Sequence, residues 1–300
     1  MSEGVDSCSY GYYRLKLPFR IDSKTASDTP EMEYILGHSE REIRRLMHQA
    51  SILRPITERL LRGAGIGRGM RVLDLGCGAG DVSMLAAELV GASGSVVGID
   101  RSPEAIAVAR GRARTAELRH VHFQEATVGA FSDPEPFDAV IGRYVLIHQA
   151  DPVALIRAAA GLVRPEGVVA FHELCVRGQA VQSLPTVSLW QQAGEWIRMA
   201  FQAAAPHHDA GGRLIEHFSR AGLPQPTVFC ESPVGRGEDS PLIAWIADTL
   251  ESFVPQLAKM RILTADTIAI DTFEDRLRTA VVEAQSQLVG PAQFCAWARV

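Results

Sequence analysis

Several classes of protein are excluded by what this chain has little of. Cysteines are few, odd in number and without paired ligand spacing, which predicts free thiols and neither a disulfide framework nor a zinc site. No stretch is apolar over the roughly 20 residues that a membrane-spanning helix needs. Basic residues do not outnumber acidic ones, and the formal net charge of -5 gives no general attraction to nucleic acid. The cysteines are Cys8, Cys77, Cys175, Cys230 and Cys295.

The first nine residues are polar and acidic, unlike a secretory signal, so we expect a cytoplasmic protein. Hydrophobic residues make up 47% of the 300 residues, which is enough for a sizeable buried core. Helical periodicity covers 31–64, where Gly37 and Pro55 predict a division into two or three helices. We therefore expect an N-terminal arm and helical cap over 1–64.

From residue 65 onward, short apolar runs alternate with helical segments. The alternation predicts a Rossmann-like, doubly wound α/β fold with a mostly parallel seven-stranded sheet. After strand five the alternation stops, and we expect a helical insertion at about 174–222 and another before the last strand at about 241–288. The expected strands lie at 70–75, 95–99, 121–123, 137–141, 167–171, 226–230 and 294–298.

A glycine-rich loop follows the first expected strand. It has Gly-x-Gly-x-Gly spacing, with Asp74 before Gly76 and Asp81 directly after Gly80. Glycines there permit a tight turn and a close approach of the backbone to a ligand. Two carboxylates are a poor cradle for a pyrophosphate, because like charges repel, but they suit a ligand with an ammonium and a sulfonium. This favours S-adenosylmethionine.

A second acid supports this prediction. Asp100 ends the second expected strand, twenty residues beyond Gly80. An acid at that offset is placed to accept hydrogen bonds from ribose hydroxyls. The alternative is that Asp100 only caps the helix that follows.

With these motifs, the chain resembles the class I S-adenosylmethionine-dependent methyltransferases, in the broad group similar to the ubiquinone and menaquinone methyltransferases. The resemblance is specific over roughly 30–175. It implies that the loop carrying Gly76, Cys77 and Gly78 lies against the methionine part of the cofactor, that Asp100 holds the ribose and that Arg101 edges the adenine. Residues 137–143 resemble the fourth-strand motif, which implies that the backbone at Arg143 accepts from the cofactor ammonium.

Two parts of the resemblance are less direct. After strand three the family commonly has Gly-Asp-Ala, whereas this chain has Ala126 and Thr127 at the aligned positions, so that the Thr127 hydroxyl takes the place of the adenine-binding acid. Glu125 is the neighbouring alternative. The segment 34–42 resembles an N-terminal segment in which Tyr34 lies over the cofactor as part of a lid. The alternative for Tyr34 is a core position in an amphipathic helix.

Two residues at strand ends are candidates for a general base, which is needed only if the nucleophile must lose a proton. His148 follows strand four and Glu173 ends strand five. His172 and Glu173 face opposite ways along the strand, and we favour Glu173. The alternatives are a surface histidine at a helix start and a structural acid.

The expected function is methyl transfer to a small-molecule acceptor by in-line displacement, with S-adenosylhomocysteine as the product. Trp190, Trp196, Met199 and Phe201 in the first insertion favour an apolar or aromatic acceptor, such as a secondary metabolite or an isoprenoid-like compound. A nicotinamide-dependent oxidoreductase and a non-catalytic S-adenosylmethionine binder are the alternatives. We expect no metal, no nucleic acid and no membrane, and a homodimer stays open.

Overall fold

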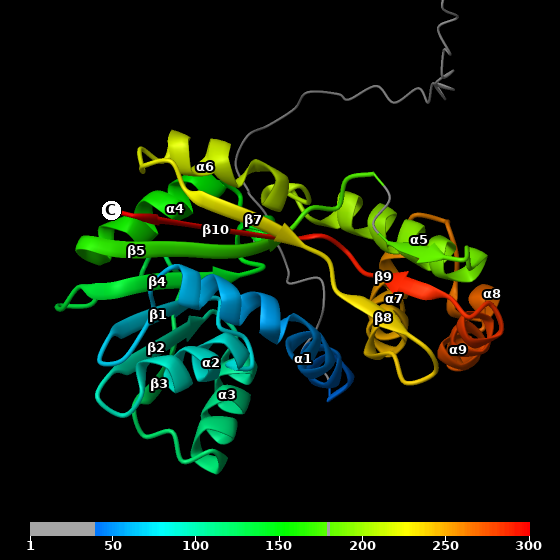
Figure 1. Cartoon of the computed structure of the whole chain (residues 1–300), viewed down its shortest axis with the longest axis horizontal. Helices are drawn as coiled ribbons and strands as arrows, with labels where there is room; N and C mark the ends of the chain where they lie inside the picture. The colour runs from blue at the N-terminus through cyan, green and yellow to red at the C-terminus, as the bar shows by residue number, and fades with distance from the viewer. Residues whose placement is uncertain (1–39, 179–180) are drawn as a thin grey trace, which may run out of the picture. The chain divides into compact units, whose positions relative to one another are not determined.

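A seven-stranded sheet forms the centre of the part of the chain that the computed structural model describes, which is residues 40–178 and 181–300. The strand order is β3-β2-β1-β4-β5-β10-β7 (Figure 1). Strand β10 runs antiparallel to both of its neighbours, and the other neighbouring pairs are parallel. The strands are β1 (Arg71–Leu75), β2 (Ser95–Asp100), β3 (Val121–Glu125), β4 (Phe137–Arg143), β5 (Val163–Leu174), β7 (Thr227–Glu231) and β10 (Gln293–Arg299).

Helices cover both faces of this sheet, which confirms the predicted α/β class. Side chains alternate along β5, so His172 meets Thr57 on one face while Phe171 meets Phe218 on the other. One face carries α1 (Glu40–Gly63), α2 (Asp81–Val90) and α3 (Pro103–Thr115). The other carries α4 (Pro152–Gly161), the short turn η2 (Ala210–Arg213) and α6 (Leu214–Arg220).

Local sequence explains where the helices on the sheet begin. The Ser102 side chain accepts a hydrogen bond from Ala105 N, and Pro103 takes the first helical position of α3. Asp151 and Pro152 repeat this arrangement at the start of α4. Both caps follow directly on segments that leave the carboxyl edge of the sheet, so they help to fix that edge.

Helix α1 differs from the sequence prediction. It continues through Pro55, where the periodicity predicted a division, and Gly37 lies outside the described residues. Proline removes one backbone donor from the helix, but packing of the buried Leu53, Ile56 and Leu60 against the core outweighs that local loss. Because α1 contacts β5, β10 and α2, the described part of the expected cap packs directly on the sheet.

The two insertions are predicted to be helical, but a second, three-stranded sheet with order β6-β9-β8 accompanies their helices. Strand β6 (Gln182–Leu184) comes from the first insertion, while β8 (Val234–Arg236) and β9 (Gln287–Val289) flank the second. We call residues 182–204 and 234–289 the lid. Its helical elements are α5 (Ser188–Ala204), α7 (Pro241–Lys259), α8 (Ala265–Ile268), η3 (Ile270–Thr272) and α9 (Phe273–Glu283).

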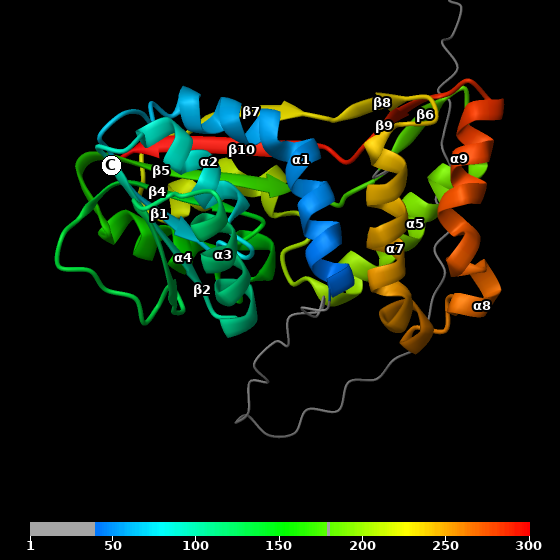
Figure 2. The same cartoon turned by 90° about the horizontal axis from the view of Figure 1, so that it is seen from below.

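Helix α7 is the centre of the lid. It contacts α5 and α9 within the lid and α1 outside it, and Figure 2 shows α1 and α7 side by side. All described residues belong to one unit of the chain. The division into 1–64 and 65–300 remains a prediction, because most of the first segment lies outside the described residues.

Candidate active site

The loop between β1 and α2 is shaped by three glycines with positive φ. Gly76, Gly78 and Gly80 have φ of 61°, 52° and 85°, a region that favours glycine. A side chain at Gly76 would meet Val145 Cγ2 at 3.0 Å, and one at Gly80 would meet the Phe123 ring at 2.9 Å. Nothing lies within 4 Å of the corresponding position at Gly78, so the loop presents bare backbone with free space beside it.

Asp100 holds this loop against the end of β2. One carboxylate oxygen accepts from Gly78 N at 2.9 Å, and the other accepts from Ser102 N at 2.9 Å. A carboxylate has about four lone-pair sites, so two remain available to hydroxyl groups of a ligand. Asp100 is partly exposed, whereas the two residues before it in β2 are buried.

The two acids that flank the loop behave differently from our electrostatic expectation. Asp74 is 1% exposed and accepts a hydrogen bond from Ser83 Oγ at 2.6 Å. Burial raises the pKa of Asp74 to about 7, against the opposing effects of Ser83 and Arg143. Asp81 forms an ion pair with Arg112 at 2.7 Å. Because both acids have protein partners, they shape the loop more than they supply free negative charge to a ligand.

The expected adenine edge lies around the ends of β2 and β3. Arg101 directly follows β2 and is exposed. Ala126 N donates to Asp100 O at 2.9 Å, which places the end of β3 beside the end of β2. Thr127 is exposed, and its carbonyl oxygen accepts from the backbone of the following turn. These positions suit the edge of a nucleoside site, and the adenine contact itself stays a prediction.

Glu173 holds the turn that follows β4. Its Oε1 accepts from Val145 N at 2.8 Å and from Leu146 N at 2.7 Å, at the start of the short helix η1 (Leu146–His148). The residue is fully buried, its Oε2 has no partner among the described residues, and burial raises the pKa of Glu173 to about 8. This geometry favours a role in positioning the turn over the predicted role as a base.

His148 is carried by η1 to the neighbourhood of the glycine loop, because Val145 at the start of that turn borders Gly76. Desolvation, followed by the positive charges of Arg101 and Arg45, lowers the pKa of His148 to about 4. The imidazole is therefore neutral near pH 7 and able to accept a proton.

A buried hydrogen-bond chain that the sequence did not reveal joins α1, β5 and β10. Gln293 Nε2 donates a hydrogen bond to Pro291 O at 2.9 Å. The amide oxygen Oε1 therefore faces His172 Nε2 at 3.0 Å and accepts a hydrogen bond from it. His172 Nδ1 lies 3.0 Å from the Thr57 hydroxyl oxygen, within hydrogen-bonding distance. Burial and the charge of Arg143 lower the pKa of His172 to about 3, so the ring is neutral.

Tyr144 and Arg143 attach β4 to the same chain of hydrogen bonds. The Tyr144 hydroxyl donates to Gln293 Oε1 at 2.6 Å, and burial raises the pKa of Tyr144. Tyr144 has φ of 57°, an unfavourable conformation for a residue with a side chain, and such strain occurs often at functional sites. Arg143 Nη1 lies 3.4 Å from Thr57 Oγ1. Four elements thus meet at the carboxyl ends of β4 and β5.

Among the described residues, no group of His, Cys, Asp or Glu is arranged to hold a metal ion, and no helix is long and apolar enough to cross a membrane. The four cysteines within the described ranges are free thiols. Tyr34 and Cys8 lie outside those ranges, so the expected lid position of Tyr34 stays a prediction.

Comparison of the sequence with known protein families shows the family to which this chain belongs. The profile of a family described as "Methyltransferase domain" matches residues 66–219, just over half of the chain, from the residues before β1 into α6. The chain belongs to this methyltransferase family. The match includes the glycine loop, Asp100, η1 and Glu173.

Curated relatives of this methyltransferase include ubiquinone biosynthesis O-methyltransferases. That of Albidiferax ferrireducens is 38% identical over 108 residues, which is 35% of this chain and 42% of the relative. That of Alkalilimnicola ehrlichii is 41% identical over 108 residues, again 35% and 42% of the two chains. The matches thus span less than half the length of these relatives.

Solved structures share the fold. The YcgJ protein from Bacillus subtilis has a TM-score of 0.54 and 16% identity, over 81% of this chain and 97% of that one. The [4+2]-cyclase SpnF has a TM-score of 0.50 and 19% identity, over 82% and 80%. These likenesses confirm the predicted fold class of the methyltransferase.

The residues of this methyltransferase fit S-adenosylmethionine, the cofactor of its family. The open backbone at Gly78 admits a ligand at close range, and Asp100 retains acceptor sites for hydroxyl groups. The structure brings Asp74, Gly76, Cys77, Gly78 and Asp100 together at one edge of the sheet, and their contacts with the cofactor stay a prediction. Sequence reasoning missed Thr57 and Gln293, because they lie more than a hundred residues to either side of the histidine that they hold.

Proposed function

We propose that this methyltransferase transfers a methyl group from S-adenosylmethionine to a hydroxyl oxygen of an apolar or aromatic small molecule. The observation that carries the proposal is the position of His148 on η1, a turn that packs on the glycine loop through Val145. Oxygen as the receiving atom is supported by the O-methyltransferases among the curated relatives.

Bound S-adenosylmethionine supplies a methyl group that its sulfonium already activates. The chain then has to hold a hydroxyl oxygen in line with that group and exclude water. His148 accepts the hydroxyl proton as the new oxygen–carbon bond forms. Glu173 is a positioning residue. Its carboxylate accepts hydrogen bonds from the backbone amides at the start of η1 and so determines where His148 lies.

The hydrogen-bond chain through His172 is proposed to keep this region rigid. It joins α1 to β4, β5 and β10 on the face of the sheet that also carries the buried Asp74. A rigid second layer is what holds reacting groups within the small tolerance that methyl transfer needs. We further propose a small-molecule substrate, no nucleic-acid or membrane partner, and a cytoplasmic location, with a homodimer open to measurement by light scattering.

The test is a methyl-transfer assay with trideuteromethyl-labelled cofactor and a panel of phenols, catechols and hydroxyquinones. We expect mass spectrometry to show a gain of one labelled methyl group on oxygen and an equal amount of S-adenosylhomocysteine. A [4+2]-cyclase shares the fold, so disappearance of the acceptor compound without a labelled methyl group on the product is not evidence of methyl transfer. Calorimetry with both cofactors is the control. Uptake of NAD without uptake of S-adenosylhomocysteine would support an oxidoreductase instead, and tight S-adenosylhomocysteine binding without turnover would support a non-catalytic binder.

A further inference from the structure

Two polar side chains on α7 are buried without a hydrogen-bond partner. Trp245 is 4% exposed and Thr249 is 6% exposed, and neither Trp245 Nε1 nor Thr249 Oγ1 has a partner among the described residues. Buried indole and hydroxyl groups almost always make hydrogen bonds, because leaving them unpaired is costly. The two residues are one helical turn apart, so they share a face of α7.

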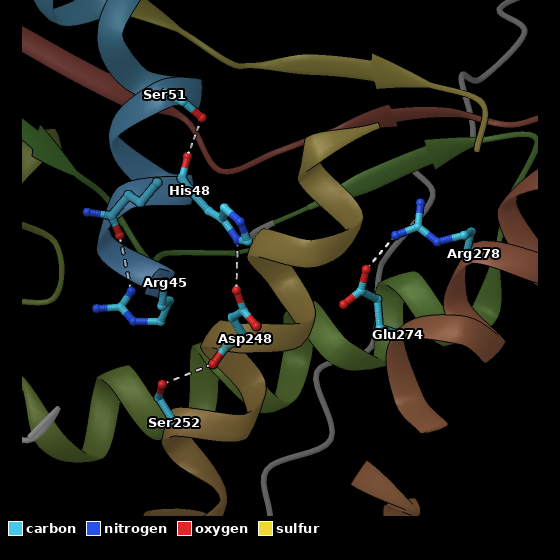
Figure 3. A network of polar contacts seen from close by, with 8 residues as sticks. Arg45, His48, Ser51, Asp248, Ser252, Glu274 and Arg278 are labelled. Atoms are coloured by element: carbon cyan, nitrogen blue, oxygen red, sulfur yellow. Dashed lines mark hydrogen bonds and ion pairs between the residues drawn. The ribbon is translucent and has the colours of Figure 1, made fainter. Parts of the chain in front are cut away.

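The neighbours of α7 show which way that face points. On one side of it, Asp248 Oδ2 lies 3.0 Å from His48 Nδ1 of α1, and Figure 3 shows these side chains reaching toward each other between the two helices. On the other side, Phe253 packs on Phe201 of α5, with ring centroids 4.7 Å apart. With about 3.6 residues per turn, the face of Trp245 and Thr249 lies between these two contacts. It therefore points between α1 and α5.

Both flanking helices lead to the candidate active site. Arg45, one turn before His48 on α1, lies close enough to His148 to lower the pKa of that histidine, after the larger effect of burial. Gln202 on α5 donates to the carbonyl oxygen of Val176, just beyond the end of β5. The two helices that border the face of Trp245 and Thr249 thus also contact residues at the carboxyl edge of the sheet, where the methyl acceptor must lie.

We propose that Trp245 Nε1–H and the Thr249 hydroxyl bind the acceptor molecule through an oxygen remote from the one that is methylated. An indole N–H only donates, so the ligand must present a hydrogen-bond acceptor there, such as a carbonyl oxygen. Leu242, Ile246 and Phe253, buried on the adjoining part of α7, favour an apolar ring system. The acceptor class is therefore a hydroxylated ring compound that also carries a carbonyl, and this inference rests on the proposed function.

The experiment compares two bicyclic phenols, 7-hydroxychromone, which carries a ring carbonyl, and 2-naphthol, which does not. The full chain, labelled with ¹⁵N-tryptophan and saturated with S-adenosylhomocysteine, is titrated with each. We expect the indole proton signal of Trp245, assigned through Trp245→Phe, to move downfield with 7-hydroxychromone and to stay in place with 2-naphthol. The signal of Trp196 on the half-buried part of α5 serves as an internal control.

A variant with a side chain of the same shape measures how much the Thr249 hydroxyl contributes to binding. Thr249→Val removes only the hydroxyl and should raise the Kd for 7-hydroxychromone about 5- to 20-fold, the scale of one or two lost buried hydrogen bonds. It should leave the Kd for 2-naphthol and for S-adenosylhomocysteine unchanged. Thr279→Val, on the exposed side of α9, is the matched control and should change neither. Since valine keeps the shape of threonine, this variant carries the test even if Trp245→Phe unfolds.

Each result separates the two proposals. If 7-hydroxychromone binds and shifts Trp245 but receives no methyl group, the binding face stands and the proposed methyl transfer to such phenols fails. If both phenols are methylated and Thr249→Val affects them equally, the methyl transfer stands and the binding face is wrong. An absence of 7-hydroxychromone binding up to millimolar concentration, or an unmoved Trp245 signal when it binds, also overturns the inference and leaves an internal water as the partner of these groups.

Discussion

The glycine loop and the lid differ in how their polar side chains are paired. Beside the loop, Asp74, Asp81 and Asp100 all have partners within the protein, through Ser83, Arg112 and the backbone. Within the lid, the buried indole nitrogens of Trp190 and Trp245 and the hydroxyl of Thr249 have none among the described residues. The acids of the glycine loop are thus held by the chain itself, whereas these three groups of the lid are left without a partner in the described part of the chain, as is Glu173 Oε2 at the end of β5.

Among the proposed substitutions, the one at His148 should have the largest effect on turnover. His148→Ala should lower kcat with a phenolic acceptor about 10²- to 10⁴-fold, the usual scale for a lost acid–base group, while the Kd for S-adenosylhomocysteine changes little. Steady-state kinetics and calorimetry measure the two quantities. With the pKa of His148 lowered to about 4, wild-type turnover should lose no activity to histidine protonation between pH 6 and 8.

The matched control for His148 is His122→Ala, which removes an exposed histidine from β3 and should have no effect. A variant at His148 that retained full turnover would show that the acceptor needs no base at this position.

The second largest effect should come from Asp100, on the affinity for the cofactor product. Asp100→Ala should weaken S-adenosylhomocysteine binding by roughly 1–3 kcal/mol, about 5- to 150-fold, because a hydrogen-bonding charge is lost and Gly78 N loses its acceptor. Calorimetry gives the affinity, and Asp100→Asn, which keeps one carbonyl oxygen, should fall between. Equal affinities in all three proteins would count against Asp100 as a ligand of the ribose.

Glu173 should make the free energy of unfolding depend on pH. Its native pKa is raised by burial to about 8, whereas an unfolded glutamate titrates near ~4.3. Between these values the native state keeps a proton at Glu173 that the unfolded state has lost, so the contribution of Glu173 to stability should fall as pH rises, by at most ~1.4 kcal/mol per pH unit. Urea unfolding of wild type and Glu173→Gln at several pH values isolates this contribution, because the difference between their free energies of unfolding should change with pH up to about 8, whereas the effect of the raised pKa of Asp74 is common to both proteins.

The same variant separates two roles for Glu173. A glutamine oxygen still accepts from Val145 N and Leu146 N, so a positioning role predicts that Glu173→Gln keeps most of its turnover and that Glu173→Ala loses it. A base role predicts that both lose it. The sequence alone favoured the base, because it shows an acid at a strand end but not the amides that the acid meets.

The smallest effect concerns the contact between the lid and α1. His48 and Asp248 meet at 3.0 Å, and the His48 side chain is 45% exposed, so a double-mutant cycle with alanine should give a coupling of about 0.2–1 kcal/mol. Urea unfolding measures the stability, and KM for the acceptor reports on the lid. Ser51→Ala, on the exposed side of α1, is the control. A coupling near zero would mean that the lid is held by apolar contacts alone.

Much of the methyl-donor half could be predicted from sequence, because its signals are local. The strands β1, β2 and β4 and the buried part of β5 are short, mostly apolar runs, and the glycines and Asp100 stand at fixed offsets from those runs. The second sheet could not be predicted, since β6, β8 and β9 have three residues each and pair across long separations. The partners of His172 were hidden for the same reason, as Thr57 and Gln293 come from opposite ends of the described chain.

The register of β7 against β10 has one more consequence. Glu231, where β7 ends, lies directly opposite Gln293, where β10 begins, and the larger part of the lid is threaded between them. A tight turn is all that is needed to join two antiparallel strands that end side by side. That part of the lid therefore occupies the place of a single hairpin connection, so its length and sequence do not affect the register in which β7 and β10 pair.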